Sequence, residues 1–191
     1  LTIDPTFGLE AYLKASNSGA FDQFGYALAV AGDTVVVGAP GEDSNATAIG
    51  GDGSNNGAAE AGAAYVFVYS AGVWSEQAYL KAANAEAGDA FGSAVAIAGD
   101  TLVVGAPYED SNANTIDGDG GNNSNGEAGA AYVFVRSGAT WTQQAYLKAA
   151  NSGANDWFGY AVAIDGDTVL VGAPGEASTA TGVNGNGADD S

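Results

Sequence analysis

A repeat with a period of 67 residues constrains this chain more than any other feature of its sequence. The pair Phe-Gly, the triplet Gly-Ala-Pro and the run Tyr-Leu-Lys-Ala each return at this interval, without insertion or deletion. The three series start at Phe24, Phe91 and Phe158, at Gly38, Gly105 and Gly172, and at Tyr12, Tyr79 and Tyr146. Because a repeat of this length folds as one unit that packs on its neighbours, we expect a tandem array of similar units.

Each unit is predicted to contain four short strands. In the first unit, bulky residues alternate with glycine and alanine from Phe24 to Val30, which indicates a strand with one large and one small face. Further strands are expected at 34–39, 63–69 and 74–82, since these segments are rich in valine and aromatic residues. The absence of a 3.6-residue apolar stripe in the sequence excludes a helical solenoid.

Two connections complete the predicted unit. Gly32-Asp33 suits a tight hairpin turn, and a long polar loop is expected over 41–61. Four antiparallel strands per unit predict an all-β fold of tandem β-propeller blades, in which the glycine-alanine face of the first strand lets the next blade approach closely. A β-sandwich of duplicated hairpins is the alternative, and the fixed long period argues against it.

The blades do not complete a ring. The predicted division is strand four of a preceding blade at 1–20, blade units at 21–87 and 88–154, and the first half of a third blade at 155–191. A closed propeller needs about four to eight blades, so we expect a partial propeller. It is either a window from a longer chain or a subunit whose copies join in trans.

The repeated residues resemble the FG-GAP repeat of integrin α-subunit propellers and their bacterial relatives. The likeness rests on Phe-Gly, on Gly-Asp-Thr followed by three aliphatic residues and Gly-Ala-Pro, and on Gly-Ala-Ala-Tyr-Val-Phe-Val, and it covers nearly the whole chain. It implies a seven-bladed, usually extracellular propeller that serves adhesion, ligand recognition or surface structure. Integrins carry a calcium loop of the Asp-x-Asp-x-Asp-Gly type between the first two strands. Here only Gly32-Asp33 and its equivalents occupy that connection, so the sequence departs from that site.

Charge and composition exclude several classes of function. The net charge is −19, from 23 acidic and four basic residues, so a phosphate backbone would be repelled and no nucleic-acid partner is expected. No apolar run is long enough for direct membrane insertion. Cysteine and histidine are absent, which removes the thiol nucleophile and the commonest general base. Because all units carry nearly the same residues, we expect no enzymatic activity.

The long polar loops are the predicted metal sites. When the loops are aligned, side-chain oxygens persist at three positions although their neighbours change. Calcium takes six to eight oxygen ligands of this kind, and the intervening glycines let backbone carbonyls turn inward. The candidate ligands are Asp52, Asn55, Asn56, Asp110, Asn112, Asp117, Asp119, Asn122, Asn123, Asn186, Asp189 and Asp190. The alternative is that these residues only form turns and need no ion.

Two sets of charged residues and one tryptophan complete the candidates. A lysine in strand four of each unit is expected to protect the blade edge or to pair with a carboxylate. An aspartate two residues before each Phe-Gly is expected to accept backbone N–H groups. The sets are Lys14, Lys81 and Lys148, and Asp22, Asp89 and Asp156. Trp157 has no aromatic counterpart in the other units and is the candidate for an exposed contact.

The leading functional hypothesis is a non-enzymatic module for adhesion or structural scaffolding, extracellular or on the cell surface, from a bacterium. Its partner would be a protein or glycan at the cell surface, and calcium would order its loops. One alternative is a carbohydrate-binding propeller with a sugar site at each blade junction, because exposed aromatic residues suit sugars. Another is a subunit of a surface filament that assembles through open blade edges.

Overall fold

The computed structural model describes residues 11–185 and 187, and this part of the chain contains ten strands and no helix. The strands are β1 (Ala27–Ala31), β2 (Thr34–Ala39), β3 (Ala63–Ser70), β4 (Val73–Leu80), β5 (Ala94–Ala98), β6 (Thr101–Ala106), β7 (Ala130–Ser137), β8 (Thr140–Leu147), β9 (Ala161–Asp165) and β10 (Thr168–Gly172). The prediction of an all-β repeat fold is therefore confirmed.

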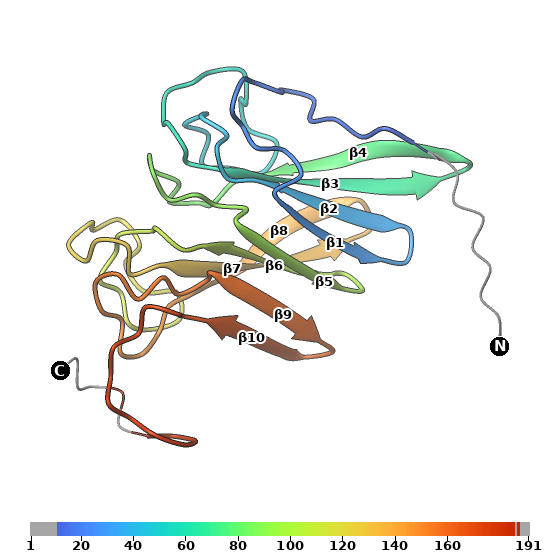
Figure 1. Cartoon of the computed structure of the whole chain (residues 1–191). Helices are drawn as coiled ribbons and strands as arrows, with labels where there is room; N and C mark the ends of the chain where they lie inside the picture. Colours follow the sequence, from blue (N-terminus) through green and yellow to red (C-terminus); the bar gives the residue numbers. More distant parts are fainter. Residues whose placement is uncertain (1–10, 186, 188–191) are drawn as a thin grey trace.

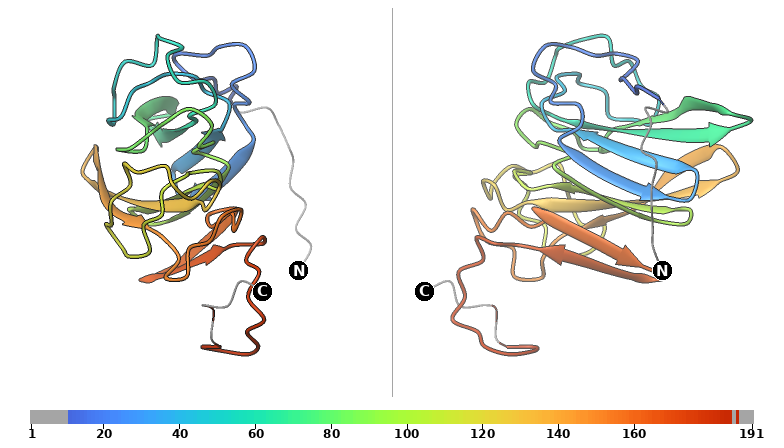
Figure 2. Two further views of the ribbon diagram at one scale, coloured as in Figure 1. Left: turned by 90° about the vertical axis from the view of Figure 1, so that its left-hand side faces the viewer. Right: turned by 45° about the vertical axis from the view of Figure 1, so that its right-hand side comes forward.

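The strands form three antiparallel sheets that stack as successive layers (Figure 1). The first sheet has the order β1-β2-β3-β4, the second has the order β5-β6-β7-β8, and β9 pairs with β10 in the third. The arrangement is that of tandem propeller blades that do not close into a ring. Short hairpin turns lie at one end of the stack, and the long β2–β3 and β6–β7 loops gather at the other (Figures 1 and 2).

The first strand of the unit begins three residues later than predicted, at Ala27 instead of Phe24. The preceding backbone is turned and not extended, since Gln23 and Gly25 have φ angles of 59° and 98°. The Tyr26 amide also donates a hydrogen bond to the Gln23 carbonyl, at 3.0 Å. The second strand agrees with the prediction, and the third and fourth differ from it by one or two residues at their ends.

One predicted strand is absent from the described residues. Strand four of a preceding blade was expected within 1–20, but 11–20 have no strand structure, and 1–10 lie outside the described residues. In both complete sheets the fourth strand pairs with the third. Within the described residues no third strand lies beside 11–15, so this segment lacks a partner for its backbone groups.

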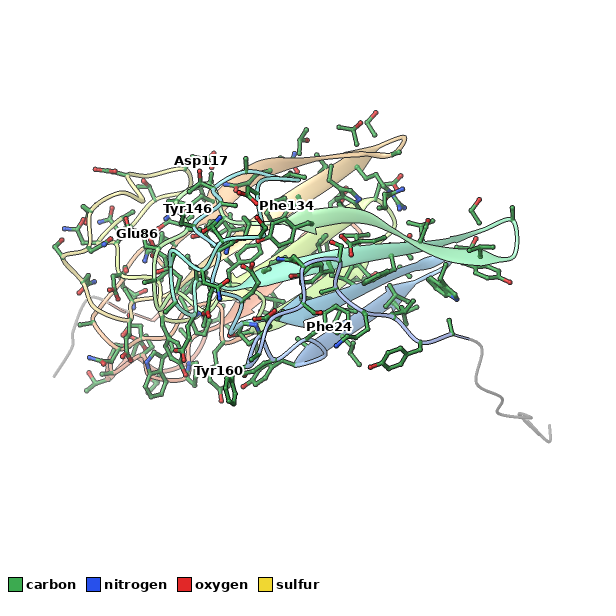
Figure 3. All side chains as sticks on the ribbon, turned by 90° about the horizontal axis from the view of Figure 1, so that it is seen from above. Phe24, Glu86, Asp117, Phe134, Tyr146 and Tyr160 are labelled. Carbon is green, nitrogen blue, oxygen red and sulfur yellow. The ribbon has the colours of Figure 1, made fainter. Side chains whose placement is uncertain are left out.

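The core lies between the sheets. Ala29 and Val36 lie opposite one another on β1 and β2, and they pack in one cluster with Val95 and Ile97 of β5. The small face of the first sheet therefore meets the bulky face of the second, as the alternation in sequence predicted. Phe91 is fully buried at this junction, together with Phe134 of β7, which is labelled in Figure 3.

Backbone contacts also join the sheets. A Cβ atom on Gly38 would lie 2.0 Å from the Gly92 carbonyl oxygen, so only glycine allows this approach. Beside it, Gly62 and Phe91 form an isolated parallel β-bridge between the first two sheets. The same bridge joins Gly129 to Phe158 at the next junction. Each junction thus combines side-chain packing with one backbone bridge.

Candidate functional site: the loop end of the blades

A buried ion pair fixes each long loop to its own blade. Lys81 follows β4 and points under the β2–β3 loop, where its Nζ lies 2.9 Å from Glu42 Oε2 and 2.9 Å from the Ser44 carbonyl oxygen. Lys81 is 1% exposed and Glu42 is 2% exposed. Burial lowers the pKa of the Lys81 ammonium, and the hydrogen bond and charge of Glu42 oppose this shift. The expected edge-protecting role is therefore wrong for Lys81, and pairing with a carboxylate is correct.

Hydroxyl groups add further hydrogen bonds around this ion pair. The Ser44 hydroxyl donates to Glu42 Oε2 at 3.1 Å and shares a 2.6 Å hydrogen bond with the Tyr79 hydroxyl. Burial raises the pKa of the Tyr79 phenol, which is therefore neutral throughout the ordinary pH range. A buried charge pair is stable only when its other hydrogen-bonding groups are paired, and this shell supplies those partners.

Asn17 ties the chain before the blade into the same network. Its Nδ2 donates to Glu42 Oε1 at 3.0 Å and to the Gly53 carbonyl at 2.9 Å, and its Oδ1 accepts the Tyr65 hydroxyl at 2.7 Å. Burial raises the pKa of the Tyr65 phenol as well. One asparagine thus links the incoming chain, the buried acid, the loop and β3.

The second unit repeats this network. Lys148 Nζ lies 2.8 Å from Glu109 Oε2, and the Tyr146 hydroxyl donates to Glu109 Oε1 at 2.8 Å (Tyr146 is labelled in Figure 3). The equivalents of Ser44, Tyr65 and Asn17 are Ser111, Tyr132 and Asn84. In the third unit, Asn151 bonds Glu176 at 3.0 Å and the Gly187 carbonyl at 2.9 Å.

Sequence reasoning missed the acid of this network. The glutamates at 42, 109 and 176 are not among the candidate residues, although each is followed two residues later by a serine. That Glu-x-Ser spacing was an available signal. In the structure the serine hydroxyl donates to the glutamate in all three units.

The predicted metal ligands of the first loop hold its turns. Asp52 Oδ1 accepts the Ser54 hydroxyl at 2.5 Å and the Ser54 amide at 2.9 Å, and these hydrogen bonds lower the pKa of this exposed carboxyl. Asn55 Oδ1 accepts the Asn45 amide at 3.1 Å, across the loop, and Asn55 Nδ2 donates to the Asp52 carbonyl at 2.8 Å. Asn56 is exposed. The turn-forming role is therefore present at Asp52 and Asn55.

The second loop uses its candidates in the same way. Asp119 Oδ1 accepts the Gly121 amide at 3.0 Å, and Asn122 Oδ1 accepts the Asn112 amide at 3.0 Å. Asp110 Oδ1 accepts the Glu127 amide at 2.7 Å. These side chains cross-link the loop to itself.

Two further candidates contact other parts of the blade (Figure 3). Asp117 Oδ1 accepts the Tyr146 amide at 2.8 Å, and Asn123 Nδ2 donates to Glu86. Asn186, Asp189 and Asp190 lie outside the described residues. Within the described part of the chain, no three acidic side chains gather where they could hold a metal ion. A calcium ion there would depend on asparagine, carbonyl and water oxygens.

The aspartates before each Phe-Gly accept backbone amides, as predicted. Asp22 accepts the Gly19 amide, Asp89 the Glu86 amide at 2.9 Å and Asp156 the Gly153 amide at 2.6 Å. Burial raises the pKa of the Asp89 carboxyl to about 7, and the charge of Glu109 adds to this effect. These carboxyls hold turns at the blade junctions.

Trp157 makes a contact within the chain. It is half-buried, and its Nε1 donates to Glu127 Oε2 at 2.9 Å. The prediction of an exposed contact at Trp157 is therefore wrong. The two groups come from adjacent units, so this hydrogen bond crosses the junction between the second and third sheets.

Comparison with known proteins agrees with this architecture. The FG-GAP repeat family matches residues 7–67, 74–134 and 141–188, which together cover most of the chain. No curated protein matches. FG-GAP repeats are typically extracellular, and within the described residues no helix is long and apolar enough to cross a membrane. A repeated Phe-Gly and Gly-Ala-Pro framework, stacked four-stranded sheets and this match lead to one conclusion: the chain belongs to the FG-GAP repeat family.

Proposed function

We propose that this chain is a non-enzymatic module for adhesion or structural scaffolding outside the cell, which presents its long loops to a partner on a cell surface. The observation that carries the proposal is the buried Lys-Glu network beneath each complete loop. It holds the loops against rigid sheets at a fixed spacing along the stack. A surface of this kind presents several similar contacts at once, which favours multivalent attachment.

The bonding partners of the buried carboxylates argue against catalysis. Glu42 and Glu109 are neutralised by lysines, and Asp22, Asp89 and Asp156 accept backbone amides. A general acid or base needs a carboxyl that can exchange protons with a substrate in a cleft. Every buried carboxylate in the described residues instead has a structural partner. The family is also generally non-enzymatic.

The proposal also includes calcium binding by the long loops. Asp52 and Asn55 correspond to Asp119 and Asn122, and in both loops each aspartate carbonyl accepts the asparagine amide at 2.8 Å. The equal geometry keeps an exposed aspartate and a half-buried asparagine in similar positions in the two loops. Calcium would bind at these positions and tighten the loops further, with water completing its coordination.

The test is adhesion of beads coated with the protein to bacterial and animal cells, with calcium or with a chelator. We expect binding that Asp52→Asn combined with Asp119→Asn reduces several-fold, and that the chelator also reduces. Calcium should raise the melting temperature of the unaltered chain, because it binds only the folded loops.

The matched control removes the same charge at the opposite end of the stack. Asp33→Asn with Asp167→Asn alters two exposed hairpin-turn residues and should leave adhesion unchanged. Equal loss in the two double variants would indicate a nonspecific charge effect and contradict the proposal. So would adhesion no stronger than that of beads carrying an unrelated protein of equal charge.

A further inference from the structure

An aromatic groove lies at the junction of the first two sheets and extends to Tyr160 of the third unit. It measures about 330 Å³, and its walls include Tyr26, Tyr108 and Tyr160 together with Glu60. The three tyrosines are 63%, 40% and 53% exposed. Figure 3 shows Tyr160 at an edge of the molecule. Within the described residues, neither these phenols nor the Glu60 carboxylate has a hydrogen-bonding partner.

Three departures from the repeat create this groove. Tyr108 stands where the other units have Gly41 and Gly175. Ser93 stands where the other units have Tyr26 and Tyr160, and Ala90 stands where they have Gln23 and Trp157. A Cβ atom on Gly41 or Gly175 would lie 2.3 Å or 1.9 Å from a backbone oxygen, so the backbone around Tyr108 must be more open than in the other units. Together the changes add an aromatic wall on one side and leave small residues on the other.

The next junction shows what closes such a groove. Glu127 is the equivalent of Glu60, and its carboxylate accepts the Trp157 indole N–H at 2.9 Å. At the first junction Ala90 occupies the position of Trp157 and cannot reach the acid. The backbone is the same at both places, with φ of 54° at Ala90 and 56° at Trp157. The carboxylate of Glu60 is therefore free because of one side chain, not because of a different fold.

We propose that this groove binds an organic ammonium cation. Tyrosine ring faces attract cations, and quaternary ammonium groups favour sites where several aromatic rings meet. Glu60 adds a negative charge, and no basic residue lines the groove. The net charge of −19 also concentrates cations near the surface and repels anionic ligands. A volume of about 330 Å³ accommodates a small molecule or the end of a side chain.

The decisive variant is Ala90→Trp, which places in the first junction the residue that the protein itself uses in the second. The new indole should donate to Glu60 and fill the groove. The probe is choline, titrated into the labelled protein and followed by NMR shifts of the Ala90 and Ser93 amides. We expect saturable shifts in the unaltered chain and none in the variant. In the variant the shifts are followed at other amides of the groove, because residue 90 itself is changed.

Two milder variants keep the test independent of folding. Tyr108→Gly restores the residue of the sister units, and Glu60→Gln removes only the charge. Each should raise the dissociation constant for choline roughly two- to fivefold, as expected for one exposed cation–π or ion-pair contact. Neither side chain bonds to the buried Lys-Glu networks, so both variants should stay folded, and their melting temperatures check this.

The ligand control is dimethylbutanol, the uncharged isostere of choline, which should bind more weakly by a similar factor. Equal binding of the two, no saturable choline binding, or choline binding indifferent to all three variants would overturn the proposal. Preferential binding of a neutral disaccharide would overturn it as well. The inference goes beyond the adhesion proposal, and either can fail alone because Asp52 and Asp119, which were altered to test adhesion, do not line this groove.

Discussion

The outward face of the first sheet and the same face of the second sheet are built from equivalent residues, but only one of them is covered. Val95 and Ile97 of β5 are half-buried against the first sheet. Leu28 and Val30 occupy the equivalent positions on β1 and are 67% and 69% exposed. Each repeat unit therefore has an apolar face, and this face is buried only where a neighbouring sheet covers it. In such arrays the stability is the sum of the stabilities of the units and of the interfaces between neighbouring units.

The charged residues show the same contrast. Lys81 is buried and paired with Glu42, while Lys14, at the equivalent position, is exposed and has no carboxylate partner in the described residues. The lysine has the same sequence context in both places. Its environment depends on whether a complete blade and its loop lie beside it.

The largest expected effect on stability comes from substitution of Lys81, and it tests the difference between Lys81 and Lys14. Lys81→Met leaves Glu42 buried without its counter-ion, which should lower the free energy of unfolding by about 3–5 kcal/mol. Lys14→Met should change it by less than about 0.5 kcal/mol, because Lys14 is exposed. Urea unfolding of the two variants measures both values. Similar losses would show that burial of the pair is not what stabilises the blade.

A junction glycine gives the next largest effect. A Cβ atom at Gly105 would lie 1.9 Å from the Gly159 carbonyl oxygen, whereas one at Gly172 meets no atom nearer than 3.6 Å. Gly105→Ala should therefore force the second and third sheets apart and cost about 1–3 kcal/mol. Gly172→Ala should be nearly neutral. Thermal melting of both proteins tests this, and a neutral Gly105→Ala would refute the close approach.

The smallest effect is a pH dependence at the junction aspartate. The pKa of Asp89 is about 7 in the folded chain against 3.8 for the ordinary carboxyl, so the folded state holds this proton more tightly. Its stabilising contribution is complete below pH 4 and is lost as the pH rises through 7. Asp89→Asn should consequently raise the unfolding free energy at pH 8 by an amount on the order of 1 kcal/mol.

The measurement for Asp89→Asn is calorimetric melting at pH 5 and pH 8, where the gain should be larger at pH 8. Asp52→Asn is the control with the opposite sign. Its pKa is lowered by the Ser54 hydrogen bonds, so the contribution of Asp52 is present at neutral pH and lost as the solution becomes acidic. A gain in unfolding free energy from Asp89→Asn that does not vary with pH would contradict the raised pKa of the Asp89 carboxyl.

The architecture could be predicted from sequence because local signals repeat. The alternation before Val30, the turn at Gly32-Asp33 and the valines of β2 each indicate strands over a few residues, and the period carries them into the next unit. The start of β1 was missed, since the turned backbone at Gln23 and Gly25 leaves no mark in an alternating pattern.

The candidate site could be predicted only in part. The acceptor role of Asp22 follows from neighbouring residues, and it was predicted correctly. The Lys81–Glu42 pair joins residues 39 positions apart, through the path of a loop that sequence does not define. The groove at Tyr108 needed the relative placement of two sheets, although its departures from the repeat were visible beforehand.

The backbone bridge at each junction has a consequence for how such molecules grow. Gly62 pairs with Phe91, and Gly129 pairs with Phe158. One residue of each bridge therefore belongs to one repeat unit, and its partner belongs to the next unit. Any in-frame duplication of the repeat unit brings both residues with it. The array can therefore lengthen by whole units without new residues to connect the sheets. Loops such as that of Tyr108 are then free to diverge.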